Sequence, residues 1–296
     1  MWTARAAWIV LPFTIGAAID DVIAPWSRAT QILAAVLLWA AWFAGVVALL
    51  APRPWGFTIL RVVAPCAAVL AVASAWSAPG PTAALAIASA VIAMIASLSS
   101  PVAHACAAST AYGPERRFPL RVPLSLLAGP LPVSVAVVGF GIASGPLLLA
   151  SGNVIAGIGA LIAGVPVVAV LVRSLTALDR RWIVLVPAGL VVVDPLTFPD
   201  PVLLPREAIA SISRTPFAAR GHERGSRHDE AEILVGGRGP LLLTCRAPGT
   251  FLRRAGRGRV SLEADRLRVS PVRPDVVLRA VAAHRIPVGS EQAQEP

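Results

Sequence analysis

Long apolar segments alternate with short polar ones over the first 172 residues of the chain. A helix needs about 20 mostly apolar residues to cross about 30 Å of hydrocarbon. Segments that approach or reach this length lie at roughly residues 6–23, 31–50, 59–77, 82–100, 124–144 and 153–172. The pattern therefore predicts a transmembrane helical domain over residues 1–172 with six membrane spans.

The first of these segments also has features of a secretory signal peptide. Only fourteen residues separate Arg5 from Asp20, and Pro12 lies among them. A basic residue, a short apolar stretch and a run of small residues such as 16–18 are typical of a cleaved signal. The segment is therefore either a first span or a removed signal, and both alternatives leave the C-terminus on the same side.

Arginine placement predicts how the expected spans are oriented. Loops rich in Lys and Arg stay on the cytoplasmic side of a membrane. The expected outer loops hold Asp20, Asp21 and Arg28, or no charge at all at 77–81 and 145–153. Both termini are therefore expected to be cytoplasmic, in a multi-pass protein of the cell membrane. The arginines on the expected inner side are Arg5, Arg53, Arg61, Arg116, Arg117, Arg121, Arg173, Arg180 and Arg181.

Short apolar runs separated by Pro, Gly and Asp follow a juxtamembrane linker at 173–178 and predict a β-rich domain over 179–286. Alternation of apolar and polar residues, as in 266–270, is typical of a strand with one buried face. Pro274 suits the first turn of a single C-terminal helix. Residues 287–296 are expected to form a disordered tail. The expected strands are 182–186, 189–193, 201–204, 208–214, 231–235, 241–246, 259–263 and 266–270.

A family resemblance is carried by the first part of this domain. It reads Arg181-Trp182-Ile-Val-Leu-Val-Pro-Ala-Gly189-Leu-Val-Val-Val-Asp194 and continues through Leu204-Pro-Arg-Glu-Ala-Ile209. A strand, a Pro-Ala-Gly turn, a second strand and Leu-Pro-x-Glu in this order resemble the bacterial PH-like domains, over roughly residues 179–285. The whole chain is similar to multi-pass membrane proteins of actinobacteria with such a domain. The resemblance implies a small barrel or sandwich capped by one helix, and it carries over no catalytic residue.

Composition supports the membrane class. The chain is 56% hydrophobic and 14% charged, with a mean hydropathy of +0.72, whereas soluble domains have about a quarter charged residues. All 26 basic residues are arginines, and the net charge is +10. The three cysteines, Cys66, Cys106 and Cys245, are far apart, so the sequence predicts neither a disulfide framework nor a zinc site.

Catalytic and metal-binding motifs are not evident. None of the expected spans has a charge at its centre, and Arg61 is expected to snorkel from the end of the third span. The cluster His222, Glu223, His228, Asp229 and Glu230 has metal-capable side chains, but it lies in a Gly- and Arg-rich loop that is expected to be mobile and solvated. We therefore expect no enzyme chemistry, no metal site and no cofactor.

The remaining candidate chemistry is the basic surface. Arginines near an anionic leaflet attract lipid headgroups, although membrane orientation alone accounts for the same residues. A second basic run, Arg253, Arg254, Arg257 and Arg259, could face lipid, nucleic acid or neither, and without interleaved aromatic residues we expect no nucleic-acid binding. The candidate residues for contact with anionic lipid or a partner are Arg116, Arg117, Arg121, Arg173, Arg180 and Arg181.

These features favour a non-catalytic anchor or scaffold that presents a cytoplasmic PH-like interaction module. Its partners are expected to be the bilayer and a membrane or cytoplasmic protein. Small residues at four-residue spacing, such as Gly141 with Gly145 and the series Ala156, Ala160 and Gly164, predict close helix packing and leave a homodimer open. A transporter or transporter subunit is the main alternative, and a membrane-bound enzyme acting on lipid precursors is a third.

Overall fold

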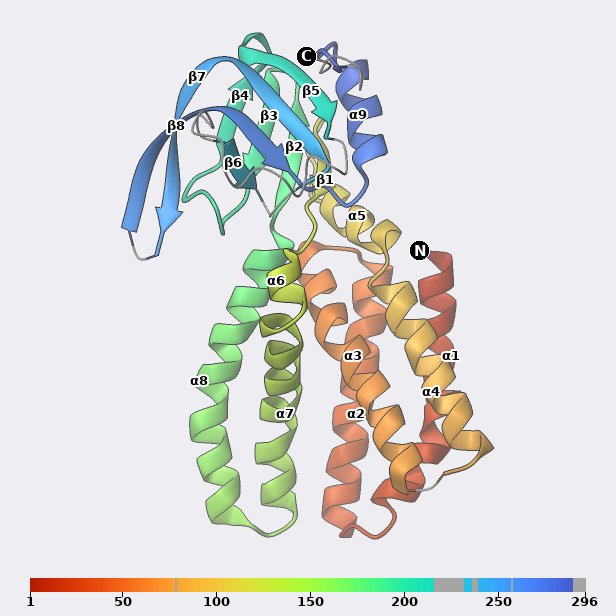
Figure 1. Cartoon of the computed structure of the whole chain (residues 1–296). Coiled ribbons are helices and arrows are strands. Elements are labelled where there is room, and N and C mark those ends of the chain that lie inside the picture. Colours follow the sequence, from red (N-terminus) through yellow and green to blue (C-terminus); the bar gives the residue numbers. More distant parts are fainter. Residues whose placement is uncertain (78, 216–231, 236–238, 257, 290–296) are drawn as a thin grey trace. The chain divides into compact units, whose positions relative to one another are not determined.

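The structure is a computed structural model that describes residues 1–77, 79–215, 232–235, 239–256 and 258–289. The chain divides into two compact units, each described by itself below (Figure 1). The helical unit consists of residues 1–109 and 128–179, and the β unit consists of residues 110–127 and 180–296.

The helical unit contains the apolar segments of the sequence. Helices α1, α2, α3, α7 and α8 are each long and apolar enough to cross a membrane. Helices α4 and α5 pass the same test as a pair, with a bend of 42° between them. The expected series of long apolar helices is thus confirmed: the described residues contain five helices, or six if the bent pair counts as one, that could cross a membrane. The bounds are α1 (Trp2–Ile23), α2 (Arg28–Leu50), α3 (Pro54–Ser77), α4 (Pro81–Ser97), α5 (Ser100–Ala108), α7 (Pro130–Ala150) and α8 (Val154–Asp179).

The bend between α4 and α5 falls inside the expected fourth span, 82–100. Ser99 has extended backbone dihedral angles, and Pro101 lies in the first turn of α5. Proline is favoured in a first turn because its missing N–H has no partner there in any case. The helix therefore stops at Ser97 and starts again in a new direction.

Helix α8 continues past the expected end of the sixth span. About 20 residues at a rise of about 1.5 Å each are enough to cross the hydrocarbon, so this 26-residue helix is longer than a span needs. Residues 173–179 contain neither Gly nor Pro, so nothing in the sequence ends the helix there. The expected linker at 173–178 is therefore helical.

The first apolar segment packs as a helix of the bundle. Trp8 is 2% exposed, and its indole Nε1 donates to the carbonyl oxygen of Trp42 at 2.9 Å. Trp42 Nε1 donates to the carbonyl oxygen of Trp8 at 3.0 Å in return. This reciprocal pair joins α1 to α2 and supports the interpretation of the segment as a span.

Small residues bring α7 and α8 together, as expected from their spacing. A Cβ at Gly164 would lie 3.5 Å from the carbonyl oxygen of Gly141, so the two backbones are close. A Cβ at Gly145 would meet Leu161, and one at Gly157 would meet Leu149. Packing that needs glycine is typical of helices that associate in lipid.

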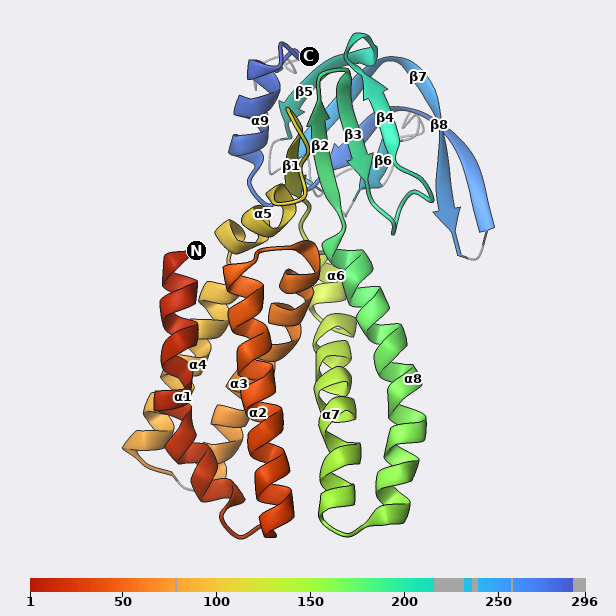
Figure 2. The ribbon, with the colours of Figure 1, turned by 180° about the vertical axis from the view of Figure 1, so that it is seen from behind.

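The described residues of the β unit form two four-stranded sheets, seen from opposite sides in Figures 1 and 2. The first has the order β1-β2-β3-β4 and is antiparallel throughout, and the second has the order β5-β7-β8-β6, in which β6 and β8 are parallel. The strands are β1 (Arg116–Pro119), β2 (Trp182–Val186), β3 (Gly189–Val193), β4 (Val202–Pro205), β5 (Ile209–Arg214), β6 (Glu232–Val235), β7 (Leu241–Ala255) and β8 (Gly258–Val269).

One apolar core lies between the two sheets and the C-terminal helix α9 (Pro274–Ala283). Ile183 and Leu185 of β2 belong to this core, as do Leu241 and Leu243 of β7 and Val277 of α9. In each strand these residues are two positions apart, because alternate side chains point to the same face. A β-rich domain closed by a C-terminal helix is therefore confirmed.

The Pro-Ala-Gly turn of the sequence forms the connection between β2 and β3. Val186 pairs with Gly189, so Pro187 and Ala188 form a two-residue loop. Gly189 has a φ of +156°, and a Cβ there would overlap the carbonyl oxygen of Leu204 on β4. Only glycine fits this position without strain.

Three parts of the β unit differ from the sequence-based expectation. Residues 110–127, expected to form a loop and the start of the fifth span, contribute strand β1 and the short helix α6 (Leu124–Leu127) to this unit. The expected strands 259–263 and 266–270 are one strand, β8. Residues 287–289, expected in the tail, run beside β5, where Pro287 accepts from and Gly289 donates to the backbone of Ile212. Residues 290–296 lie outside the described part.

Candidate functional site

The six candidate arginines do not form one site. Arg173 lies on α8 in the helical unit, whereas the other five belong to the β unit. Arg116, Arg121, Arg173 and Arg180 are exposed, and Arg117 is partly buried. Arg181 is 1% exposed and is one of the largest fully buried side chains among the described residues.

Arg181 is occupied by an internal ion pair. Its Nε donates to Asp194 Oδ1 at 2.6 Å, and its second terminal nitrogen donates to Asp194 Oδ2 at 3.1 Å. Both side chains are fully inaccessible to solvent. This two-pronged geometry is the strong form of an Arg–carboxylate pair. Arg181 therefore has no guanidinium edge for lipid or a partner, contrary to the expectation from its place after the last span.

The same pair joins three parts of the β unit. The remaining terminal nitrogen of Arg181 donates to the carbonyl oxygen of Arg121, which follows β1. Asp194 accepts from the hydroxyl of Thr197 at 2.8 Å and from the backbone N–H of Leu196 at 3.1 Å. The pair thus fixes the segment after β1 and the turn after β3 to the start of β2.

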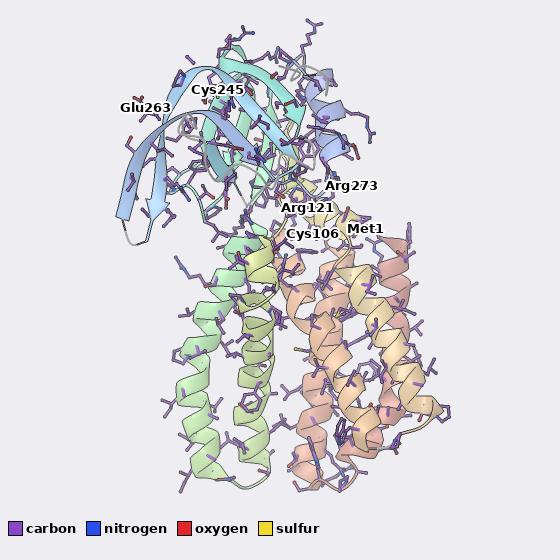
Figure 3. The ribbon with its side chains drawn as sticks, viewed as in Figure 1. Met1, Cys106, Arg121, Cys245, Glu263 and Arg273 are labelled. Atoms are coloured by element: carbon purple, nitrogen blue, oxygen red, sulfur yellow. The ribbon has the colours of Figure 1, made fainter. Side chains whose placement is uncertain are left out.

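Arg117 and Arg121 also have partners within the β unit. The Arg117 guanidinium lies 5.3 Å from the ring centre of Trp182 and pairs with Glu115 at 3.1 Å. A terminal nitrogen of Arg121 donates to the carbonyl oxygen of Val272 at 3.4 Å, and Figure 3 shows Arg121 and Arg273 at the same end of the unit. Their exposed edges remain available, but part of each group already stabilises the fold.

A polar cluster that no sequence motif indicates lies between α3 and α8. Asp179 Oδ1 accepts from Arg61 at 2.6 Å, and Asp179 Oδ2 accepts from the hydroxyl of Thr58 at 2.7 Å. The side chains of Arg61 and Asp179 are 12% and 1% exposed. Arg61 therefore forms an ion pair instead of only snorkelling to solvent. Asp179 follows the apolar segment and lies at the start of the expected β domain, so the sequence does not indicate its contact with α3.

Strands β7 and β8 continue beyond the sheets as an arm, residues 252–256 and 258–261. Within the described chain, β5 pairs with β7 only as far as Cys245, and β6 pairs with β8 only from Arg266 onward. The arm strands therefore pair only with each other, and both views show the hairpin extending away from α9 (Figures 1 and 2). Every residue of the arm is exposed.

Arg254 and Arg259 lie directly opposite each other across the arm. Like charges in this position destabilise a strand pair. Among the described residues, Arg253, Arg254 and Arg259 have no side-chain hydrogen bond or ion pair, and the nearest acid along β8 is Glu263 (Figure 3). The backbone N–H of Arg254 donates to the carbonyl oxygen of Thr197, which ties this part of β7 to the turn after β3.

The described residues contain no group of three or more His, Cys, Asp or Glu side chains that could hold a metal ion. The cluster His222, Glu223, His228, Asp229 and Glu230 lies outside these residues. All three cysteines are free thiols. Burial and the nearby negative charge of Asp265 raise the pKa of Cys245, so this thiol is a poor nucleophile at neutral pH.

Comparison with known proteins gives no match for this chain among protein-family models, curated proteins or solved structures.

Proposed function

We propose that the protein is an integral membrane anchor that presents its β unit, a PH-like interaction module, on the cytoplasmic side of the cell membrane in a regulatory or structural role. The supporting observation is the way the chain connects the two units. It passes between them after Ser109, after Leu127 and after Asp179. Only Arg180 and Arg181 separate the end of α8 from the start of β2.

Three short connections suit a module that is presented at a membrane. A module on one long flexible linker explores a large volume, whereas short connections limit how far the chain lets a module move from its anchor. The buried Arg181–Asp194 pair starts two residues after α8 and locks the beginning of β2 to the turn after β3. The second segment of the β unit is therefore fixed to the rest of the unit from Arg181 onward.

The architecture of the β unit is consistent with the PH-like resemblance. Two four-stranded sheets and one C-terminal helix correspond to the small sandwich that the resemblance implies. The parallel pairing of β6 with β8 is a local departure from an otherwise antiparallel arrangement. The proposal uses the resemblance only for the kind of module, because the motifs carry over no catalytic residue.

Site-specific photo-crosslinking in native membranes tests this function. A crosslinker at exposed Arg116 or Arg285 of the β unit is expected to capture a partner protein or phospholipid headgroups. The matched control is a crosslinker at Phe140 on α7, which is 75% exposed in an apolar helix and should capture lipid acyl chains. Turnover of a substrate by the purified full chain, or a β unit located outside the cell, would contradict the proposal.

Transport is the second candidate, and the Asp179 cluster is the observation that favours it. Charged groups within membrane helices are costly and often mark ion or substrate paths. Within the described part of the chain, Arg61 Nε has no hydrogen-bond partner, so the cluster is not fully satisfied there. If the cluster serves transport, proteoliposomes should show solute or ion flux that Asp179→Asn reduces at least about tenfold. Absence of flux, with the protein folded, excludes this candidate.

A further inference from the structure

We propose that the arm of β7 and β8 is a docking element for anionic phospholipid headgroups, with Arg254 and Arg259 as the principal contacts. This inference deepens the proposed function, because it rests on the β unit being presented at a membrane surface. It concerns a different set of residues from the six arginines near the expected spans.

Charge is the first argument. Arg254 and Arg259 are cross-strand neighbours on one face of the arm, and Arg253 lies on the other face opposite Val260. No acid occurs between residues 252 and 261. An anionic phosphate between two facing guanidinium groups would turn their repulsion into two charge-assisted hydrogen bonds. Among the described residues no acid pairs with these two arginines, so an external phosphate group can bind between them.

The apolar residues of the arm favour lipid over other polyanions. Leu252 is 40% exposed on the face that carries Arg254 and Arg259, and Val260 is 53% exposed on the face that carries Arg253. Alternating apolar and basic side chains are typical of elements that enter the headgroup region, where the apolar groups reach the acyl boundary and the cations meet phosphates. A nucleic-acid surface would instead be expected to expose aromatic residues for base stacking. The aromatic residue nearest the arm, Phe251, is 5% exposed and belongs to the core.

Covalent connection makes headgroups the most available anions. The β unit is joined to the candidate spans at three points along the chain, so bilayer phosphates are present at high local concentration without any diffusional search. Each arginine close to an anionic surface is expected to change the ratio of docked to free arm about fivefold. Docking of the arm would add a contact with the lipid headgroups to the three covalent connections between the units.

The test uses the full chain in lipid nanodiscs. Ser261, which is exposed and lies opposite Leu252, is replaced in Ser261→Cys and labelled with a bimane fluorophore. The unsubstituted protein, treated identically, provides the background from its own cysteines. Nanodiscs contain phosphatidylcholine alone or with about one third phosphatidylglycerol, together with traces of a lipid that carries a nitroxide quencher on its headgroup. Quenching of bimane measures contact between the arm and the headgroups.

Phosphatidylglycerol is expected to increase quenching in the wild-type arm. The double variant Arg254→Gln/Arg259→Gln should lose this increase, with about a 25-fold change in the docked-to-free ratio. Arg254→Lys/Arg259→Lys keeps the charge and should retain most of it. The matched control Arg246→Gln/Arg279→Gln removes two exposed arginines of the β unit outside the arm and should behave as wild type.

Several results would overturn the inference. Equal quenching in both lipid mixtures would show that anionic headgroups do not attract the arm. Equal losses in the arm variant and the control variant would show a bulk charge effect. Stronger protection of bimane from aqueous iodide by an RNA oligonucleotide or a poly-glutamate peptide than by phosphatidylglycerol would assign the arm to another polyanion. Catalytic turnover or solute flux would instead remove the proposed function and leave this readout unchanged.

Discussion

Arg173 and Arg181 both follow a long apolar segment, yet their environments are opposite. Arg173 is exposed on the last turns of α8, whereas Arg181 is buried and paired with Asp194. The positive-inside pattern treats the two residues alike because it counts charges near spans. Only the pairing of β2 with β3 brings Asp194 within reach of Arg181, and this contact depends on the fold of the β unit.

Loss of the Asp194 carboxylate should strongly destabilise the β unit. Asp194→Ala leaves the Arg181 guanidinium buried without its partner, which is expected to cost about 3–5 kcal/mol. Hydrogen exchange of peptides from 182–193 in the purified full chain would measure the loss. Replacement of both residues, as in Arg181→Leu/Asp194→Leu, should recover a large part of it. Glu115→Ala removes a partly exposed pair and should cost at most about 1 kcal/mol.

Cys245 should react slowly with alkylating reagents. Burial and Asp265 raise its pKa above the ordinary value of 9.0, so the reactive thiolate is scarce at neutral pH. Asp265→Asn removes one cause, lowers the pKa and should increase the alkylation rate at pH 8, as measured by mass spectrometry of the Cys245 peptide. Because the pKa of Cys245 is higher in the folded than in the unfolded chain, the protonated thiol contributes to the stability of the fold. This stability is fully present below pH 9.0 and is lost as the pH rises through the folded pKa. An unchanged rate in the variant would contradict the assigned role of Asp265.

At the scale of elements, the hydrophobic pattern predicted those strands and helices whose own sequence alternates between apolar and polar residues or carries a clear start signal. Strands β2 and β3 have the expected bounds, and α9 begins at Pro274 as expected. Strand β1 was missed because its sequence, Arg-Arg-Phe-Pro, has one buried apolar residue, Phe118, and is otherwise typical of a charged loop. Its structure comes from pairing with β2, which lies more than sixty positions further along the chain. Likewise, the arm has no buried face and therefore no alternation that marks its full length.

The contact of α1 with α2 should depend on the size of residue 45. A Cβ at Gly45 would overlap the indole ring of Trp8, which is hydrogen-bonded to Trp42. Gly45→Ala should therefore destabilise the helical unit by about 1–3 kcal/mol, seen as a lower unfolding temperature in detergent. At Gly16 on α1 a Cβ would meet no described atom within 4 Å outside the neighbouring backbone of its own helix, so Gly16→Ala serves as the matched control. Equal unfolding temperatures for both variants would exclude this packing role.

At the scale of the whole molecule, the sequence predicted two parts but not how the chain divides between them. Composition changes near residue 173, and this change marks the start of the larger β segment. It does not mark residues 110–127, which lie between apolar segments and belong to the β unit. Membership in a unit is decided by long-range contacts such as the pairing of Phe118 with Ile183, which no local pattern reports.

The helical unit has one arginine-rich end, and this asymmetry predicts its orientation. The Arg5 guanidinium donates to the carbonyl oxygen of Leu49 near the end of α2, and Arg61 near the start of α3 pairs with Asp179 at the end of α8. The start of α1 and the end of α8 are thus at the same end of the unit as the α2–α3 connection, which contains Arg53 in the sequence (Figure 1). By the positive-inside rule we predict that this end faces the cytoplasm.

Cysteine labelling of intact cells with an impermeant maleimide tests the orientation. Ala24→Cys and Ser151→Cys lie in the exposed connections α1–α2 and α7–α8, and they should be labelled from outside. Ala51→Cys, in the exposed connection α2–α3, should be labelled only after the membrane is opened. The unsubstituted chain gives the background from its own thiols.

The reverse pattern would place the β unit outside the cell and would contradict both the orientation and the proposed cytoplasmic module. Labelling of Ala24→Cys and Ser151→Cys from opposite sides would instead show that α4 and α5 do not form a span, because the six-span path alone returns both loops to one side.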